Sequence, residues 1–437
     1  MIEKNIEWYG TLPKNWSTPK MSYVCNTITD YTASGSFASL AENVIYRDTE
    51  DYAMLVRTAD LSKKRDINPV FIDEKAYNFL NNSNLFGGEL IMSNVGSVGD
   101  VYLYEPLYQK ASLAPNAIMV RANGYEKFLF YLFSTKQAVE GLLSITNTTT
   151  QPKFNKTQLR SFRVPFPDQL TMEKIVKHLD KKTKQIEDIK NKLSEEIESL
   201  ENYKKSVITE AVTKGLDKNV EMKDSGIEWI GEIPKHWEVK RIKNLGNCRN
   251  GLTYSPLDIC DEKEGTLVLR SSNVKDGKIV LNNNIYVNTK IPKKLMVKDG
   301  DILICSRNGS KDLIGKNAII NNIDATFGAF MMIYRSKNPK LMYYLLNSNI
   351  FYYYLGTFFT STINQLTNAN FENMKIVWCE NDSEQDQIVD YLDKKTKLIN
   401  DSIAIKQKQL ETLEEYKKSL IYEYVTGKKE VEDGEES

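Results

Sequence analysis

Apolar side chains recur at three- and four-residue steps through two long stretches of the chain, and neither stretch contains proline or glycine. This spacing places the apolar residues on one face of an α-helix, with Lys and Glu on the other faces. Residues 172–212 align with residues 385–425 without a gap. At 1.5 Å per residue, each helix would be about 60 Å long. The pattern predicts two copies of one long helix whose apolar stripes pack against each other.

The residues expected in the core of this helix pair share the apolar stripe. They are Ile175, Leu179, Ile186, Leu193, Ile197, Leu200 and Val207 in the first helix, and Ile388, Leu392, Ile399, Leu410, Leu413 and Leu420 in the second.

The segments that precede the two helices have the same order of elements but different residues. In each copy a short strand leads to a polar turn, and a strand–loop–strand unit follows (residues 87–104 and 299–320). A Tyr/Phe/Leu-rich helix (126–143 and 339–355) and a threonine-rich loop then precede the long helix. We therefore predict an α+β protein of two mixed α/β domains separated by two long antiparallel helices. The helices would form a coiled coil in a pseudo-two-fold, circular arrangement.

A lead-in segment with two tryptophans, a glycine and a proline also occurs twice, as IEWYGTLPKNW (residues 6–16) and IEWIGEIPKHW (227–237). One linker joins the first long helix to the second lead-in segment. If the two chain ends are counted together as an interrupted linker between the second long helix and the first lead-in segment, the two linkers have similar lengths. We therefore expect Trp8 to lie near Val425, as Trp229 lies near Val212. The predicted divisions are a first domain (1–167), a first helix (168–215), a linker with the second domain (216–379), a second helix (380–426) and an acidic tail (427–437).

Composition limits the classes of protein that remain. The 437 residues exceed one ordinary core, 41% are apolar, and no apolar run approaches 18 residues. The N-terminus lacks the pattern of a secretory signal, so we expect a cytoplasmic protein. The five cysteines include no CxxC pair, which favours reduced thiols over a zinc site or disulfides.

No convincing catalytic or cofactor motif is present. NPVF (68–71) lacks the second proline of the methyltransferase tetrapeptide NPPY, and a turn explains it better. GSKDLIGKN (309–317) resembles a P-loop but has the wrong glycine spacing, and Asn317 replaces the magnesium-binding Ser or Thr. We therefore predict a chain that is not itself an enzyme and that holds no metal or cofactor.

Charge and loop chemistry suggest a polyanionic partner. Residues 238–378 carry 19 Lys and Arg against 11 Asp and Glu, whereas residues 17–160 carry 14 of each. Polar loops rich in Ser, Thr, Asn, Gln, Arg and Lys recur at equivalent places in both copies. Such side chains contact phosphates and base edges. Ordinary turn chemistry is the more frequent explanation of any single loop, but repetition of the loops on two diverged domains favours binding.

The whole order, and most specifically IEWIGEIPKHW, the LDKKTK helices and the YKKS helix ends, resembles the specificity subunit of type I restriction-modification systems. The resemblance implies two target recognition domains that each read one half of a split double-stranded DNA sequence in phage defence. It implies two modification (methyltransferase) subunits and restriction (translocase/endonuclease) subunits as partners. S-adenosylmethionine, ATP and magnesium would be bound by those partners.

With this resemblance, we expect DNA contacts from polar residues of the recurring loops. In the first domain they are Arg57, Thr58, Lys63, Lys64, Arg65, Ser93, Asn94, Thr149, Gln151 and Lys153, and in the second Arg270, Ser271, Asn273, Lys275, Arg307, Asn308, Ser310, Lys311, Asn364 and Gln365.

Two other functions remain open at this point. One is an enzyme that acts alone through an unrecognised site. The other is a two-domain coiled-coil scaffold that binds proteins and not DNA. The target sequence, its spacer length, the surfaces that bind partner subunits and the presence of restriction subunits do not follow from the residues.

Overall fold

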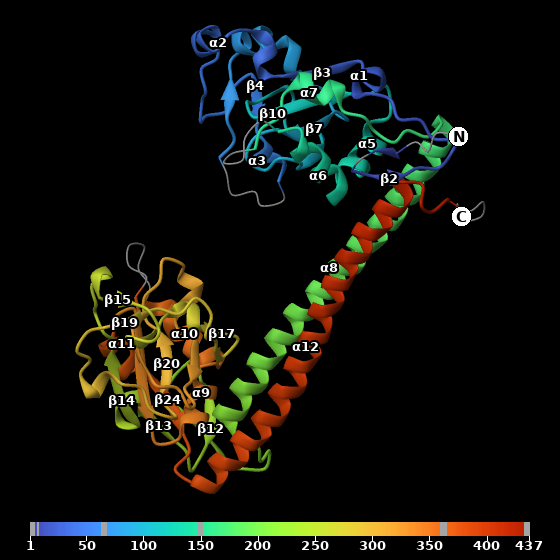
Figure 1. The fold of residues 1–437 in the computed structure, drawn as a ribbon. Helices are drawn as coiled ribbons and strands as arrows, with labels where there is room; N and C mark the ends of the chain where they lie inside the picture. The colour runs from blue at the N-terminus through green and yellow to red at the C-terminus, as the bar shows by residue number, and fades with distance from the viewer. Residues whose placement is uncertain (1–4, 7, 63–67, 147–151, 359–364, 432–437) are drawn as a thin grey trace. The chain divides into compact units, whose positions relative to one another are not determined.

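The structure is a computed structural model that describes residues 5–6, 8–62, 68–146, 152–358 and 365–431. The chain divides into two compact units (Figure 1). The first unit contains Met1–Lys192 and Gln409–Ser437, and the second contains Leu193–Lys408. Both ends of the chain therefore belong to the same unit, as the circular plan predicts.

The first unit holds two four-stranded sheets whose strand orders are β3-β10-β7-β8 and β5-β4-β9-β6. Buried apolar residues fill β7, β10, β4 and β9, as expected for strands covered on both faces. Strands β4 and β9 pair in parallel, and every other pair in these two sheets is antiparallel. The strands are β3 (Thr27–Asp30), β10 (Ala117–Arg121), β7 (Leu90–Ser93), β8 (Val101–Leu103), β5 (Phe71–Ile72), β4 (Ala53–Val56), β9 (Ala111–Leu113) and β6 (Asn84–Leu85).

The second unit also holds two four-stranded sheets. The order β14-β23-β20-β21 repeats that of β3-β10-β7-β8, whereas in β15-β19-β16-β22 the strand β22 of the parallel pair lies at the edge of the sheet. Its parallel pair, β16 with β22, matches the parallel pair of the first unit. The strands are β14 (Gly246–Asn250), β23 (Met331–Ser336), β20 (Ile302–Cys305), β21 (Asn317–Ile319), β15 (Ile259–Cys260), β19 (Tyr286–Val287), β16 (Thr266–Leu269) and β22 (Ala325–Phe327). A further strand pair, β13 (Glu238–Arg241) with β24 (Lys375–Trp378), lies next to the long helix in sequence.

Each aromatic-rich helix predicted from the sequence is in fact two helices. Residues 126–143 form α5 (Glu126–Phe133) and α6 (Lys136–Ser144), and residues 339–355 form α9 (Pro339–Leu345) and α10 (Asn349–Phe358). The break before α6 occurs at Thr135, which is extended and whose hydroxyl accepts the backbone N–H of Ala138. Threonine is a preferred N-cap, and its local bond outweighed the continuous apolar pattern.

The two long helices are present, as predicted. Helix α8 (Gln169–Lys214) has 46 residues and α12 (Asp382–Val425) has 44. A glycine with positive φ follows each of them, Gly215 (φ 72°) after α8 and Gly427 (φ 65°) shortly after α12. Such a conformation satisfies the last carbonyls of a helix and costs glycine less than any other residue.

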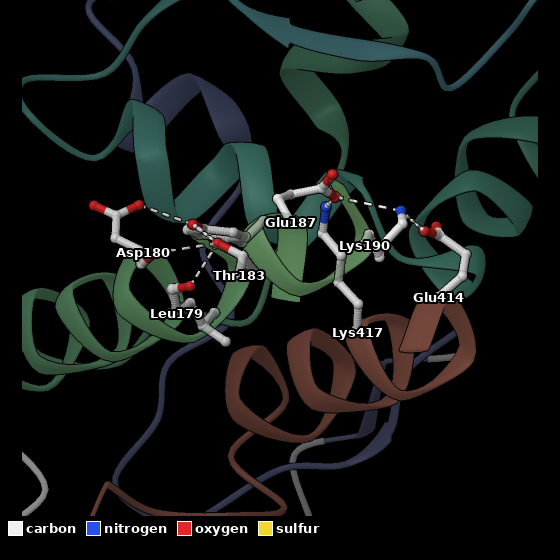
Figure 2. A network of polar contacts seen from close by, with 8 residues as sticks. Leu179, Asp180, Thr183, Glu187, Lys190, Glu414 and Lys417 are labelled. Atoms are coloured by element: carbon white, nitrogen blue, oxygen red, sulfur yellow. Dashed lines mark hydrogen bonds and ion pairs between the residues drawn. The ribbon is translucent and has the colours of Figure 1, made fainter. Parts of the chain in front are cut away.

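Within each unit the two helices run antiparallel. In the first unit Glu187 pairs with Lys417 and Lys190 pairs with Glu414, both at 2.7 Å, so partners later in α8 lie earlier in α12 (Figure 2). In the second unit the Lys204 ammonium donates to the Asn400 amide oxygen at 3.0 Å. These contacts lie along the sides of the apolar stripe.

The predicted helix-pair core is buried toward the helix ends and only half-buried in the middle. Ile175, Leu179, Ile186, Val207, Ile388, Leu392, Ile399 and Leu420 are buried, whereas Leu193, Ile197, Leu200, Leu410 and Leu413 are half-buried. Apart from Ile399, the buried positions belong to clusters that include domain side chains. Two helices alone leave part of each stripe accessible to water, because a complete core needs a third packing element.

A polar clasp joins each domain to its long helix. In the first unit the Tyr131 hydroxyl of α5 donates to Asp180 of α8 at 2.8 Å, and Lys127 forms an ion pair with the same carboxylate. In the second unit Tyr344 and Lys340 of α9 bind Asp393 in the same way. Both aspartates come from the LDKKTK motif, so this repeated motif anchors a domain to its helix.

The lead-in segments pack where the sequence predicted. Trp8 packs against the buried cluster that contains Val425, and the Tyr9 and Tyr422 rings lie 6.3 Å apart. In the second unit, Ile227 and Ile230 on either side of Trp229 share a buried cluster with Val212. The first copy of the segment therefore completes a junction with the end of α12.

Among the residues that the structure describes, no helix is both long enough and apolar enough to cross a membrane.

Candidate nucleic-acid interface

A cleft of about 1280 Å³ opens in the second unit where several strands end. Loops after β14, β16 and β20 and the turn between β22 and β23 form its walls. Of the residues predicted from the sequence, the cleft brings together Arg270, Ser271, Arg307, Asn308 and Gln365. They come from three separate segments, so the fold assembles a single polar site from loops that are distant in sequence.

Arg270 presents a positive charge to this cleft. Its backbone N–H donates to the Asn273 side-chain oxygen at 2.9 Å, and its Nη2 donates to the Asn283 carbonyl at 2.7 Å. Among the described residues, its Nε has no hydrogen-bond partner. No carboxylate of the described residues forms an ion pair with this guanidinium, so the charge of Arg270 is not balanced by an acidic side chain there.

Arg57 occupies the equivalent position in the first unit, but its positive charge is balanced by an ion pair. Both arginines follow a buried strand of a parallel pair and begin a short helical turn, α3 (Thr58–Leu61) after β4 and η5 (Ser271–Asn273) after β16. Asp60 stands where the second unit has Asn273, and it accepts bonds from Arg57 Nε at 2.9 Å and Nη2 at 2.7 Å. These bonds raise the pKa of Arg57. One exchange of Asp for Asn thus contributes to the charge difference between the two domains.

Phe330 is a residue of the cleft that the sequence analysis missed. Its ring is 59% exposed although it is large and apolar, and the Arg307 guanidinium lies 5.4 Å from its centroid. Asn116 is its counterpart in the first unit, because the Asn116 carbonyl accepts the N–H of Asn94 as the Phe330 carbonyl accepts that of Ser306. In the sequence, Phe330 belongs to an apolar run next to a strand, which is typical of the hydrophobic core. Only the exposure of its side chain in the folded structure distinguishes Phe330 from a core residue.

Three predicted contact residues hold the loops in place. The Asn273 amide is fully buried and donates to the Val280 carbonyl at 3.0 Å. Asn94 is buried and donates to the Phe154 carbonyl at 2.9 Å, and Ser93 is buried with its hydroxyl on the Val95 carbonyl. In these positions their hydrogen bonds shape the loops.

Other predicted residues lie at the surface. Lys153, Lys275, Ser310 and Lys311 are exposed and Thr58 is half-buried. Lys153 forms an isolated bridge with Val95, as Gln365 does with Arg307, so the two threonine-rich loops return to equivalent places. The predicted residues Lys63, Lys64, Arg65, Thr149, Gln151 and Asn364 lie outside the described residues.

A buried ion pair supports the equivalent sheet in each unit. Asp301 (2% exposed) binds Arg335 through Nε at 2.6 Å and Nη2 at 2.9 Å. Glu89 (3% exposed) binds Arg121 at 3.2 Å in the first unit. Each carboxylate comes directly before the strand that carries a polar loop at its other end. Removing one partner of such a pair would leave a buried charge, so both pairs must stay intact for the loops to keep their positions.

The cleft combines arginine cations, amide and hydroxyl groups and an exposed aromatic ring. Arginine binds the O6 and N7 acceptors of guanine or a phosphate, amides bind adenine, and apolar groups contact the thymine methyl group. Together with the doubled scaffold, the site defines a class of protein with two domains of one fold that carry different polar surfaces, each attached to a long helix.

The family comparison identifies this class. The model of the type I restriction modification DNA specificity domain matches residues 13–199 and 234–415. The chain belongs to this family, and the match covers both copies of the repeat.

Two relatives illustrate the similarity. The type I restriction enzyme MjaVIII specificity subunit of Methanocaldococcus jannaschii is 28% identical over 316 residues, which are 69% of each chain. The type I restriction enzyme EcoBI specificity subunit of Escherichia coli is 23% identical over 332 residues, covering 70% of this chain and 63% of that one.

A solved structure shares the fold. A chain from a study of complex assembly and conformational transition of the type I restriction-modification system superposes with a TM-score of 0.68 at 15% identity. The superposition covers 95% of this chain and 99% of that chain. The predicted fold class is therefore confirmed.

Proposed function

We propose that this chain is the DNA sequence-specificity subunit of a type I restriction-modification complex and reads a split target, with one half-site bound by each domain. The observation that carries the proposal is the diverged loop chemistry on one repeated scaffold. Arg270 beside Asn273 replaces Arg57 beside Asp60, and Phe330 replaces Asn116. Two copies that supported one shared structural role would not need different side chains at the exposed positions.

In the second domain, Arg270 and Arg307 supply donors to base edges or phosphates, and Asn308 and Gln365 supply amides. The Asn308 amide donates to the Ser271 hydroxyl at 3.1 Å, so these two groups are already oriented before a ligand arrives. A well-placed bidentate contact contributes about 1–3 kcal/mol of discrimination between bases. A few such residues in each domain are sufficient for a half-site.

The first domain would bind its half-site with less positive charge on its contact residues than the second domain. Because the Arg57 charge is balanced by Asp60, the contact residues of this domain are the exposed Lys153 and Asn116 and the half-buried Thr58. Modification subunits, recruited by the chain, would supply further phosphate contacts, the methyl donor and the chemistry. The chain itself acts in recognition and not in catalysis, and restriction subunits join the same assembly.

The two clasps support a further part of the proposal, that the long helices set the spacing between half-sites. Asp180 and Asp393 fix each domain to a defined turn of a helix through a tyrosine and a lysine. A domain held in this way cannot slide along the helix without breaking a charged hydrogen bond.

Methylation mapping tests the proposal directly. Genomic DNA from cells that express this chain with its modification subunit should carry methyladenine in one bipartite sequence, and cells without the chain should lack that methylation. Replacement of residues 17–155 by the corresponding domain of another family member should change one half of the target and leave the other half unchanged. Methylation that does not depend on this chain, or a target that the replacement does not alter, would contradict the proposal.

A further inference from the structure

Three side chains that commonly bind transition metals meet at the beginning of α12 in the second unit. His236 follows strand β12 (Glu232–Pro234), Cys379 follows β24, and Glu384 lies in the first turn of α12. One ligand atom from each lies within 4.8 Å of the other two. The Glu384 Oε2 atom lies 2.8 Å from His236 Nε2 and 3.1 Å from Cys379 Sγ. The three possible ligand atoms therefore lie close together in one place.

A second layer of contacts orients this cluster. The Trp237 indole Nε1 donates to Glu384 Oε1 at 3.0 Å, which leaves Oε2 facing His236 and Cys379. Trp237 is 1% exposed, and Cys379 is also 1% exposed. Metal sites use such outer hydrogen bonds to fix the orientation of their ligands.

The first unit builds the same junction without any of these ligands. Trp16 is buried there as Trp237 is here. The lead-in segment has Asn15 in the place of His236, and the constant offset between the long helices puts Thr171 in the place of Glu384. Phe166 pairs with Ser17 in the first unit, and Trp378 pairs with Glu238 at the equivalent place in the second. The residue after Phe166 is Pro167, which therefore takes the position of Cys379. The fold of the junction therefore does not require the histidine, cysteine and glutamate.

We propose that His236, Cys379 and Glu384 form a zinc-binding site particular to the second unit. A thiolate, an imidazole and one carboxylate suit zinc, whereas calcium and magnesium prefer sites made of oxygen ligands alone. The ligands would be the neutral Nε2 of His236, the Sγ of Cys379 and the Oε2 of Glu384, with a water molecule in the fourth position. On binding, the Cys379 thiol would release its proton to solvent.

Two of the three proposed ligands, His236 and Glu384, are reached from a surface pocket. A pocket of about 300 Å³ borders His236 and Glu384 and is also lined by Lys214 and Asp217 from the end of α8 and the residues after it. These two side chains have opposite charges, so they add no net charge to the pocket wall.

A bound ion would join the lead-in segment to both the last strand and the first turn of α12. It would thereby stabilise the attachment of the second domain to its helix. The site is independent of DNA recognition, so it can exist whether or not the proposed function holds.

The test uses the full chain, stripped with a chelator and titrated with zinc chloride by calorimetry. We expect one zinc ion per chain and a higher thermal unfolding temperature with zinc than without. Cobalt(II) in place of zinc should produce the near-ultraviolet charge-transfer absorption of a thiolate ligand. Cys379→Ser should abolish that absorption, whereas Cys260→Ser, a matched change elsewhere in the same unit, should preserve it.

A second pair of variants covers the case in which Cys379→Ser fails to fold. His236→Asn and Glu384→Thr introduce the residues of the first unit at the same junction, and each should weaken zinc binding at least tenfold. Absence of zinc binding by the folded chain, or binding that all three substitutions leave unchanged, would overturn the proposal and identify the cluster as a hydrogen-bonded contact only. Neither result would bear on DNA recognition, because no DNA or partner subunit takes part.

Discussion

Arg57→Gln and Arg270→Gln are the same substitution at equivalent positions of the two units, and we expect them to have different effects. In the first unit the change removes two hydrogen bonds, at 2.7 and 2.9 Å, from the buried Asp60 carboxylate. Breaking a buried ion pair costs about 3–5 kcal/mol. Since the Arg57 side chain is 31% exposed and water reaches it, the lower limit of about 3 kcal/mol is the appropriate expectation.

In the second unit no carboxylate is left unpaired by the substitution. Arg270→Gln removes the bond from Nη2 to the Asn283 carbonyl, at a cost of about 1 kcal/mol. Its main effect should be on binding, because a lost base contact weakens DNA affinity by about 1–3 kcal/mol, or about 5- to 150-fold.

Hydrogen exchange measured by mass spectrometry separates the two effects in the full chain. Amides of β4 that exchange through local opening should exchange about 100-fold faster in Arg57→Gln, whereas those of β16 in Arg270→Gln should change about fivefold. DNA affinity is measured for both variants in the presence of modification subunits. Equal acceleration in the two units would refute the assigned role of Asp60, and unchanged affinity of Arg270→Gln would refute the assigned role of Arg270.

Three further predictions concern the helix pair and the cleft. The hydrogen bond from Lys190 lowers the pKa of Glu414 below its ordinary value of 4.5. This carboxylate therefore stabilises the fold above pH 4.5, and the contribution is lost as the pH falls through the lowered value. Glu414→Gln should cost up to about 1 kcal/mol at pH 7, and a difference in unfolding free energy that persists unchanged at pH 3 would contradict this. Phe330→Ala should relax base preference in the second half-site alone, as read by methylation mapping, and an altered first half-site would show that the cleft does not act independently. Four residues inserted after Leu200 in α8 and after Ile403 in α12 add about 6 Å, nearly two base-pair steps, so the spacer in the methylated sequence should lengthen, and a constant spacer would exclude the helices as its determinant.

The parts of the fold that could be predicted from the sequence depend on periodicity and repetition. The apolar stripes of the long helices follow from 3.6-residue geometry, and the repeated lead-in segments by themselves predict that Trp8 lies near Val425. The break at Thr135 was missed because one side-chain bond to the backbone outweighs a continuous apolar pattern.

For the candidate site, the sequence predicted which types of residue take part but not which of them line the cleft. Polar loops after strands identified Arg270, Arg307 and Gln365, which do line the cleft, but they also selected Asn273, which is buried. Whether an asparagine faces a ligand or supports a loop depends on which carbonyl lies beside it, here that of Val280. Such neighbours come from distant parts of the chain.

The sequence by itself determined the doubled plan, the two long helices and the family, because each is expressed in local periodicity or in residues that repeat along the chain. Only the tertiary structure decided that Arg57 forms an ion pair with Asp60, whereas Arg270 lies beside the uncharged Asn273. It also decided that Phe330 is exposed. The tertiary structure also brought together His236, Cys379 and Glu384, which no sequence spacing connects. The physical reason is that charge, exposure and metal ligation depend on distances of a few ångströms between residues far apart in the chain.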